Sequence, residues 1–158
     1  LLKNSKKLII LKAFTKLYGM AGVRLGYCLC SDTELLARMR AAGQPWAVSS
    51  LAQAAGIAAL DETEYVAKVR ALIEAQRPVL ADGLRALGLR VIEGRANYLL
   101  FRAPEALGEA LRRKGAVLRS CGNYPGLDAS WYRTAVRTEN ENRQLLALLA
   151  ETLPEVAQ

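Results

Sequence analysis

The sequence predicts an α/β protein, and three patterns along its 158 residues support this fold class. Short apolar runs near the start, at residues 8–11 and 23–30, have the length and content of strands. Apolar side chains then recur at helical spacing over residues 32–87. After Gly88, strand and helix patterns alternate to the end. We therefore expect helices packed on a sheet, with the C-terminal part forming a small α/β sandwich.

The first two predicted strands flank a loop that contains glycines. Residues 8–11 are a continuous apolar run, which predicts a strand buried on both faces. The strand at 23–30 is followed by Ser31 and Asp32, which predict a turn and a helix N-cap. Gly19 and Gly22 in the loop permit conformations or close approaches that a side chain would block.

The middle of the chain is predicted to be helical, with an interruption at residues 43–45 and a new start at residue 49. One long helix is predicted over residues 61–87, and Pro78 should kink or split it. The later elements follow from the same patterns: strands at 89–93 and 98–101, a helix at 104–114, strands at 117–118 and 131–136, and a helix at 140–153. Thr138 and Glu141 fit a capping box before the last helix.

Composition narrows the classes of partner. The net charge of +7 is spread along the chain and aromatic content is only 6%, a pattern that argues against nucleic acid and favours small anionic ligands. No apolar run approaches the roughly 20 residues that span a bilayer, so we expect a cytoplasmic protein without membrane contact.

Histidine and cysteine limit the chemistry further. The chain contains no histidine, so it supplies no Ser-His or Cys-His pair and no histidine ligand for a metal. Cys28, Cys30 and Cys121 are predicted to be reduced packing residues, because their number is odd and two alternate within one apolar run. The spacing of Cys28 and Cys30 is too short for the usual zinc motif. We predict no metal site.

The residues best suited to chemistry lie between positions 13 and 27. Lys16 follows an apolar run, two glycines follow it, and Arg24 lies eight residues downstream. Burial disfavours a charged amine, and an unprotonated amine attacks carbonyl carbons. A glycine loop beside an arginine can also hold an anion. The alternative is a solvated lysine in a loop between strands; the glycines and Arg24 favour a site.

Four residues of the C-terminal part are candidates for binding a substrate. Arg119 opens a polar, glycine-containing connection between strands, and Asn97 offers an amide. Arg133 and Arg137 are four residues apart, which in a strand puts both on one face. Arg137 has a second interpretation as a partner near the start of the last helix, and Asn97 has one as a turn residue. Arg133 is the hardest to explain structurally, because an unpaired buried charge is costly.

Two motifs carry a resemblance to a known family. The pattern Thr-Lys-x-x-Gly-x-x-Gly-x-Arg-x-Gly-Tyr at residues 15–27 resembles the cofactor-lysine motif of the class I/II aminotransferases, fold type I enzymes that depend on pyridoxal 5′-phosphate. Residues 132–142 resemble their carboxylate-binding arginine segment. The resemblance implies the C-terminal portion of such an enzyme, with the end of the large cofactor-binding domain at 1–60, the interdomain helix at 61–87 and the small domain at 88–158.

The resemblance also implies roles for single residues. Lys16 would form the Schiff base with pyridoxal 5′-phosphate and move the proton at the substrate Cα. Thr15 and Arg24 would bind the cofactor phosphate, and Arg133 would take the substrate α-carboxylate. Many relatives have serine where this chain has Ala13. Thr15, Arg24 and groups upstream would therefore have to hold the phosphate.

Residues 119–127 and 131–137 look like those of the threonine-phosphate decarboxylases of cobalamin synthesis, which are close relatives of the histidinol-phosphate aminotransferases. Substrates of both subgroups carry a phosphate, so Arg119 and Arg137 are candidate phosphate ligands and Asn97 is a further substrate candidate. The two reactions differ in which Cα bond is aligned with the cofactor, which the sequence does not show. We favour the decarboxylase, with the aminotransferase as the alternative, and expect the full-length enzyme to be a homodimer.

The chain opens at Leu1 and Leu2 without methionine, which favours the continuation of a longer protein over the alternative of a complete domain cleaved from a tag. The family's aspartate that pairs with the cofactor ring belongs to the preceding part, so we expect this chain alone to be inactive and Lys16 to be exposed. Stoichiometric labelling of Lys16 by cofactor and borohydride in the isolated chain would contradict this. A structural or regulatory protein with this fold is a further hypothesis. Ala13 favours it, whereas Lys16, Arg24 and Arg133 together argue against it.

Overall fold

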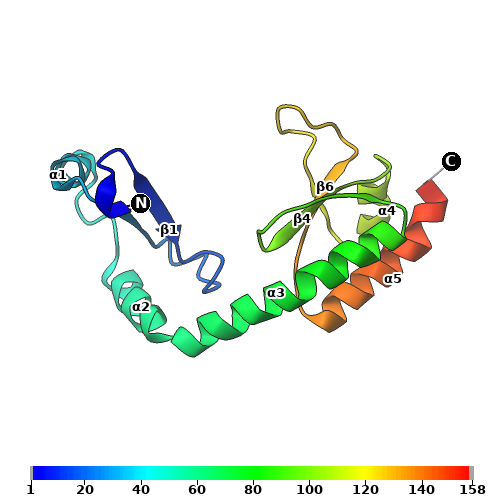
Figure 1. The fold of residues 1–158 in the computed structure, drawn as a ribbon, viewed down its shortest axis with the longest axis horizontal. Helices are drawn as coiled ribbons and strands as arrows, with labels where there is room; N and C mark the ends of the chain where they lie inside the picture. The colour runs from blue at the N-terminus through cyan, green and yellow to red at the C-terminus, as the bar shows by residue number, and fades with distance from the viewer. Residues whose placement is uncertain (1, 157–158) are drawn as a thin grey trace. The chain divides into compact units, whose positions relative to one another are not determined.

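The computed structural model describes residues 2–156 and divides the chain into two compact units, Leu1–Val69 and Arg70–Gln158. The boundary falls within the long helix α3 (Thr63–Ala86), which is green in Figure 1. The predicted fold class is confirmed, because strands and helices are mixed in both units. The predicted division into a large-domain segment, an interdomain helix and a small domain, with boundaries at residues 60 and 87, stays a prediction.

The first unit is built on one antiparallel strand pair. A short 3-10 helix, η1 (Leu2–Asn4), precedes β1 (Ile9–Ala13), and the chain returns as β2 (Gly26–Cys30). The register pairs Ala13 with Gly26, so the intervening loop leaves and rejoins the strands at directly opposed residues. The predicted loop between two strands is therefore confirmed.

Two helices follow the strand pair, and local capping defines their starts. The helix α1 (Thr33–Ala42) begins after Asp32, whose Oδ1 accepts a hydrogen bond of 2.9 Å from the backbone N–H three residues on. This confirms the predicted N-cap. The helix α2 (Ser50–Asp61) begins in the same way after Ser49, where the hydroxyl accepts at 3.1 Å. Both helices start within a residue of the prediction.

The burial of β1 was predicted wrongly. All its residues are exposed, and Leu11 is 76% exposed. Within residues 2–156, β1 pairs with β2 alone, and a two-stranded ribbon offers too little neighbouring surface to bury an apolar run. The strand β2 also begins three residues later than predicted, because Val23 and Arg24 belong to a turn.

The loop between β1 and β2 is anchored by an aromatic residue. Phe14 is 3% exposed, and its ring stacks on that of Tyr18 with centres 5.0 Å apart. At the other end of the loop, Leu25 packs so closely on Gly56 of α2 that an added Cβ would lie 2.3 Å from its Cδ2. Both ends of the loop are thus fixed by packing, whereas Lys16 and Arg24 between them are exposed.

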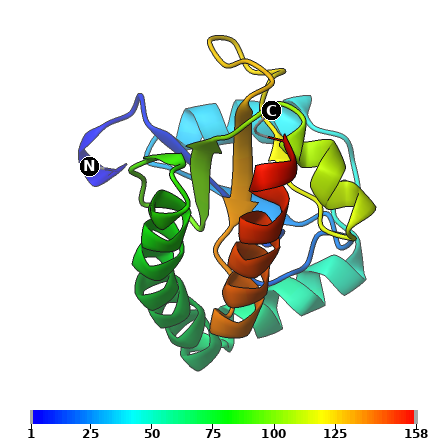
Figure 2. The ribbon, with the colours of Figure 1, turned by 90° about the vertical axis from the view of Figure 1, so that its right-hand side faces the viewer.

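The second unit contains a four-stranded antiparallel sheet with the strand order β3-β4-β6-β5. The two central strands are β4 (Tyr98–Arg102) and β6 (Trp131–Ala135). The edge strands are β3 (Arg90–Ile92) and β5 (Arg119–Ser120). The connection from β5 to β6 extends beyond the sheet in Figures 1 and 2.

Helices cover one face of this sheet. The second part of α3 lies beside α5 (Glu139–Val156) in both views, and α4 (Leu107–Arg113) completes the layer (Figures 1 and 2). The buried side chains between sheet and helices include Leu80, Leu84, Leu99, Phe101, Leu107, Leu111, Tyr132 and Leu149. Because side chains alternate along a strand, the neighbours of these strand residues point to the opposite face.

The second unit differs from the prediction at Pro78 and at several element boundaries. The helix α3 is not split by Pro78; the carbonyl that loses its hydrogen-bond donor belongs to Glu74, an exposed residue, and the turns beyond it are held by buried leucines. The strand β5 lies two residues later than expected, and α4 begins three residues later.

The three cysteines are free, as predicted. Within residues 2–156, no helix is long and apolar enough to cross a membrane.

Candidate active site

Lys16 lies in the turn that follows Phe14, and its side chain is exposed as predicted. The turn is closed by the backbone N–H of Gly19, which donates to the Lys16 carbonyl at 3.2 Å. Gly19 has a φ of +66°, a conformation that glycine adopts without strain. Within residues 2–156 the Lys16 amine has no hydrogen bond or ion pair. It is therefore available for a reaction.

Thr15 and Arg24 lie on the same connection between β1 and β2. Thr15 is half-buried beside Lys16, and Arg24 is exposed with a φ of 56°. The guanidinium donates one hydrogen bond, from Nη1 to the Ala21 carbonyl at 3.0 Å, and its remaining N–H groups have no partner within residues 2–156. A non-glycine residue in the left-handed region is strained, and such strain is common where a side chain must be aimed at a ligand.

The chemistry of this loop fits pyridoxal 5′-phosphate. An amine suits the cofactor's aldehyde, whereas a hydroxyl and a guanidinium are donors for its phosphate. No carboxylate pairs with Lys16 or Arg24 within residues 2–156, so neither positive charge is already neutralised by the protein. Ala13, at the start of the loop, has no hydroxyl to add to this set. The loop thus offers a nucleophile for an aldehyde and hydrogen-bond donors for a phosphate.

In the second unit, Arg119 and Arg133 lie directly opposite each other on β5 and β6. Directly opposed side chains on an antiparallel pair are close neighbours on the same face, and like charges in such positions destabilise a sheet. This face is the one that the helices leave uncovered. Two opposed guanidinium groups therefore create a positive site that an anionic ligand would neutralise.

Each of these arginines lies over an aromatic ring. The Arg133 guanidinium carbon is 4.6 Å from the centre of the Tyr98 ring, and that of Arg119 is 5.9 Å from the centre of the Tyr124 ring. Arg119 also donates to the Asn123 side chain at 3.3 Å. Neither arginine pairs with a carboxylate in the described part of the chain, so both charges remain available to a ligand.

Arg133 lines a cavity of about 180 Å³ with largely apolar walls, formed with Tyr98, Leu100, Cys121, Tyr124 and Leu127. Sequence reasoning did not single out Tyr98 or Tyr124 as site residues. The signal for Tyr98 was the alternation along β4, which puts it on the face of Arg133 once the register is known. Tyr124 had no comparable signal, because it lies in an irregular loop.

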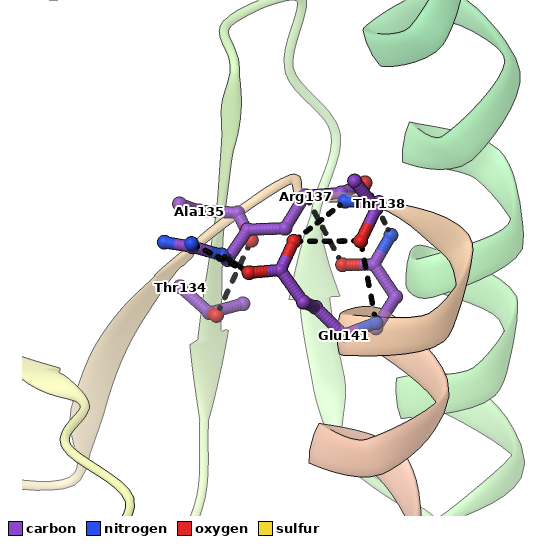
Figure 3. Close-up of polar contacts among 6 residues, drawn as sticks. Thr134, Ala135, Arg137, Thr138 and Glu141 are labelled. Carbon is purple, nitrogen blue, oxygen red and sulfur yellow. Dashed lines mark hydrogen bonds and ion pairs between the residues drawn. The ribbon is translucent and has the colours of Figure 1, made fainter. Parts of the chain in front are cut away.

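Arg137 is separate from this pair. It lies beyond the end of β6, so the prediction that it shares a strand face with Arg133 was wrong. Its Nε donates to Glu141 Oε1 at 2.7 Å, which confirms its second interpretation (Figure 3). Thr138 donates to the other oxygen of Glu141 from its hydroxyl, at 2.6 Å, and from its backbone, at 3.2 Å. The predicted capping box is thus confirmed. Its Glu141 also accepts a hydrogen bond from the Arg137 side chain, which is therefore engaged within the protein.

The same contacts change the titration of Glu141. Hydrogen bonds from Arg137 and Thr138 lower the pKa of Glu141 from 4.5 to about 2. The carboxylate of Glu141 raises the pKa of Arg137 in return. Because the pKa of Glu141 is lowered by folding, its contribution to stability is full above pH 4.5 and is lost as the pH falls through about 2.

Replacing Glu141 with glutamine is expected to lower the unfolding temperature of the full-length protein at pH 7, because the side chain loses its charge, its ion pair with Arg137 and one of its two acceptor oxygens. The difference from the natural protein should shrink as the pH falls from 4.5 toward 2, where the natural side chain also becomes neutral. Thermal unfolding across this pH range measures it. Glu105→Gln, at an exposed residue without an ion pair in the described part, is the control. A difference that stays constant with pH would contradict the expectation.

Asn97 lies in the turn between β3 and β4, and its carbonyl accepts the backbone N–H of Val136 at 2.9 Å. Its interpretation as a turn residue is therefore supported. Asn97 also lines a depression of about 390 Å³, bounded by Arg70, Arg77 and Arg95 among others, which does not include Arg133. Of the four predicted substrate residues, the structure brings together only Arg119 and Arg133 in the part of the chain that it describes.

The comparisons with known proteins identify the family of the chain. The family model for class I and II aminotransferases matches residues 1–149, and the chain belongs to this family. Its members depend on pyridoxal 5′-phosphate, so the predicted cofactor class is confirmed. The predicted fold, that of fold type I enzymes, is confirmed as well, and the chain covers 48% of the solved chain that it matches.

Individual relatives bear two different names. The chain is 38% identical over 160 residues to the threonine-phosphate decarboxylase of Salmonella typhimurium, covering 99% of this chain and 44% of that protein. It is 38% identical over 158 residues to a histidinol-phosphate aminotransferase of Symbiobacterium thermophilum, covering 98% and 43%. The solved histidinol-phosphate aminotransferase of Clostridium acetobutylicum has a TM-score of 0.92 at 31% identity, covering 98% and 48%. The chain thus spans less than half the length of these proteins.

Proposed function

We propose that this chain supplies the cofactor lysine and the substrate-binding arginines of a pyridoxal 5′-phosphate enzyme that decarboxylates threonine phosphate. The observation that carries the proposal is the opposed pair Arg119 and Arg133, each without a carboxylate partner in the described residues. O-phospho-L-threonine carries two anionic groups, a carboxylate and a phosphate. One arginine for each group neutralises both the ligand and the repulsion within the pair. A location in the cytoplasm, a homodimer and a role in cobalamin synthesis are part of the same proposal.

Each residue then has a defined task. Lys16 Nζ would hold the cofactor through its aldehyde carbon and would deliver a proton to the substrate Cα once the carboxylate has left. Arg24 and Thr15 donate to the cofactor phosphate. Arg133 holds the substrate carboxylate and Arg119 the substrate phosphate, whereas Arg137 remains with Glu141. The cofactor, when bound, supplies the electron sink for the bond that breaks at Cα.

The proposed reaction consumes one proton from solvent. The bond between Cα and the carboxylate carbon breaks, carbon dioxide leaves without the bonding electron pair, and Lys16 delivers to Cα one proton that solvent then replaces. The product is a phosphorylated amino alcohol. No oxidant or second substrate is required, in contrast to transamination, in which an amino-group acceptor must follow.

The second candidate is an aminotransferase of the histidinol-phosphate type, which the names of several relatives favour. Histidinol phosphate carries a phosphate but no carboxylate. Arg119 and Arg133 would then both bind the same phosphate dianion, which the opposed geometry also allows. The two candidates therefore differ in how the arginine pair divides its ligands.

The products distinguish the candidates. The full-length protein with pyridoxal 5′-phosphate and O-phospho-L-threonine should release carbon dioxide without forming a keto product. A keto product from histidinol phosphate and an amino acceptor, without carbon dioxide release, would support the aminotransferase instead. Neither product, together with no cofactor absorbance, would support a protein that keeps the fold without the chemistry.

A further inference from the structure

The guanidinium of Arg133 is supported by a ring rather than by an acid. Leu100 is its directly opposed partner on β4, and Tyr98 is the diagonal neighbour, within reach of a long side chain. The guanidinium carbon lies 4.6 Å from the centre of the Tyr98 ring, within the range of a cation–π contact. Arg133 is half-buried, so the contact offsets part of the cost of removing its charge from water.

Two other arginines of the second unit, Arg102 and Arg137, bind oxygen atoms of the protein. Arg102 donates from Nε to the Ser130 hydroxyl at 2.8 Å, and Arg137 donates to Glu141. Those arginines use N–H groups in hydrogen bonds to the protein. An aromatic ring contacts the flat face of the guanidinium instead, so the N–H groups at the edge of the guanidinium stay free. Arg133 is thus stabilised without losing a donor.

We propose that Tyr98 is the positioning residue of the substrate site, whose ring fixes the plane of Arg133 so that the guanidinium edge meets a carboxylate in the cavity that both residues line. The ring carries the role, and the hydroxyl of Tyr98 does not. This inference rests on the proposed assignment of Arg133 to the substrate carboxylate. A fixed plane presents two parallel N–H donors, which match the two coplanar oxygens of a carboxylate.

The test measures ligand binding to the full-length protein by titration calorimetry. The ligands are O-phospho-L-threonine and O-phosphoethanolamine, of which the second has neither the carboxylate nor the methyl group of the first. Tyr98→Leu should weaken binding of O-phospho-L-threonine roughly tenfold and leave binding of O-phosphoethanolamine within about twofold. Tyr98→Phe should bind both ligands like the natural protein. Equal losses in the phenylalanine and leucine variants would overturn the role of the ring.

Two further variants separate positioning from folding. Tyr98→Val keeps a strand-forming residue without a ring and should repeat the leucine result, so the test survives if the leucine variant is unstable. Trp131→Leu removes another ring from the same face, one that lies 5.7 Å from the guanidinium carbon of Arg90. It should leave binding of both ligands unchanged. A similar loss in Trp131→Leu would indicate a general effect of ring removal and would overturn the proposal.

A double-mutant cycle with Arg133→Gln identifies the route of the effect. In that background Tyr98→Leu should not weaken binding of O-phospho-L-threonine further, because the ring acts through the guanidinium of Arg133. A tenfold loss that persists in the Arg133→Gln background would overturn the inference. If Arg133→Gln alone leaves binding of O-phospho-L-threonine unchanged, the proposed assignment of Arg133 fails first. If Arg133→Gln weakens binding and Tyr98→Leu does not, only the present inference fails.

Discussion

Replacing Lys16 with alanine is expected to lower the turnover of the full-length protein by roughly a thousandfold or more. Lys16 is exposed and its amine has no partner within residues 2–156, so its removal should cost little stability. The loss should come from chemistry, because the variant has no amine to bind the cofactor aldehyde or to deliver a proton to Cα. Carbon dioxide release from O-phospho-L-threonine, measured with excess cofactor, gives the size of the effect.

The matched control is Lys12→Ala. Lys12 is also exposed and lies four residues earlier, on β1, where it pairs with Tyr27 across the strands. Its removal takes away the same charge from the same unit, so a general electrostatic effect would appear in both variants. We expect normal turnover from Lys12→Ala. Borohydride reduction of the natural protein with cofactor should label Lys16, and an equal label on another residue of Lys16→Ala would contradict the assignment.

The fold was predicted best where the signal was local. Asp32 caps α1 because its carboxylate accepts a bond three residues on, and Thr138 with Glu141 does the same at α5. Such contacts depend only on a few neighbouring residues. The exposure of Leu11 was not predictable in this way, because burial depends on how many other elements cover the strand. Val23 and Arg24 were assigned to a strand for a similar reason, since apolar content does not reveal a turn.

The site shows the same limit. Arg133 and Arg137 were expected to share a face from their spacing, but β6 ends before Arg137, and a local ion pair with Glu141 occupies it. The true neighbour of Arg133 is Arg119, fourteen positions away in the sequence and directly opposite it in the sheet. That pairing depends on the register of β5 and β6, which is a long-range property. Tyr98 was missed because its position over Arg133 depends on the register of β4 and β6.

The second large effect is expected from the arginine pair itself. Arg133→Gln should reduce kcat/KM for O-phospho-L-threonine by roughly 100-fold to 1,000-fold, because it removes a charged partner of the carboxylate. Arg119→Gln should have a similar effect through the phosphate. Arg90→Gln is the control, since Arg90 lies over Trp131 on the same sheet and is not part of the opposed pair. It should lower kcat/KM by less than about twofold.

The division of ligands within the pair is what decides between the two candidate substrates. If Arg119 binds the phosphate and Arg133 the carboxylate, Arg119→Gln should weaken binding of O-phosphoethanolamine by at least roughly tenfold, and Arg133→Gln should leave it nearly unchanged. If both arginines bind one phosphate dianion, as histidinol phosphate requires, both variants should bind O-phosphoethanolamine more weakly, and to a similar extent. Titration calorimetry with the two variants measures this difference. Equal losses would therefore reject the decarboxylase assignment of the pair, even though they would leave its role in anion binding intact.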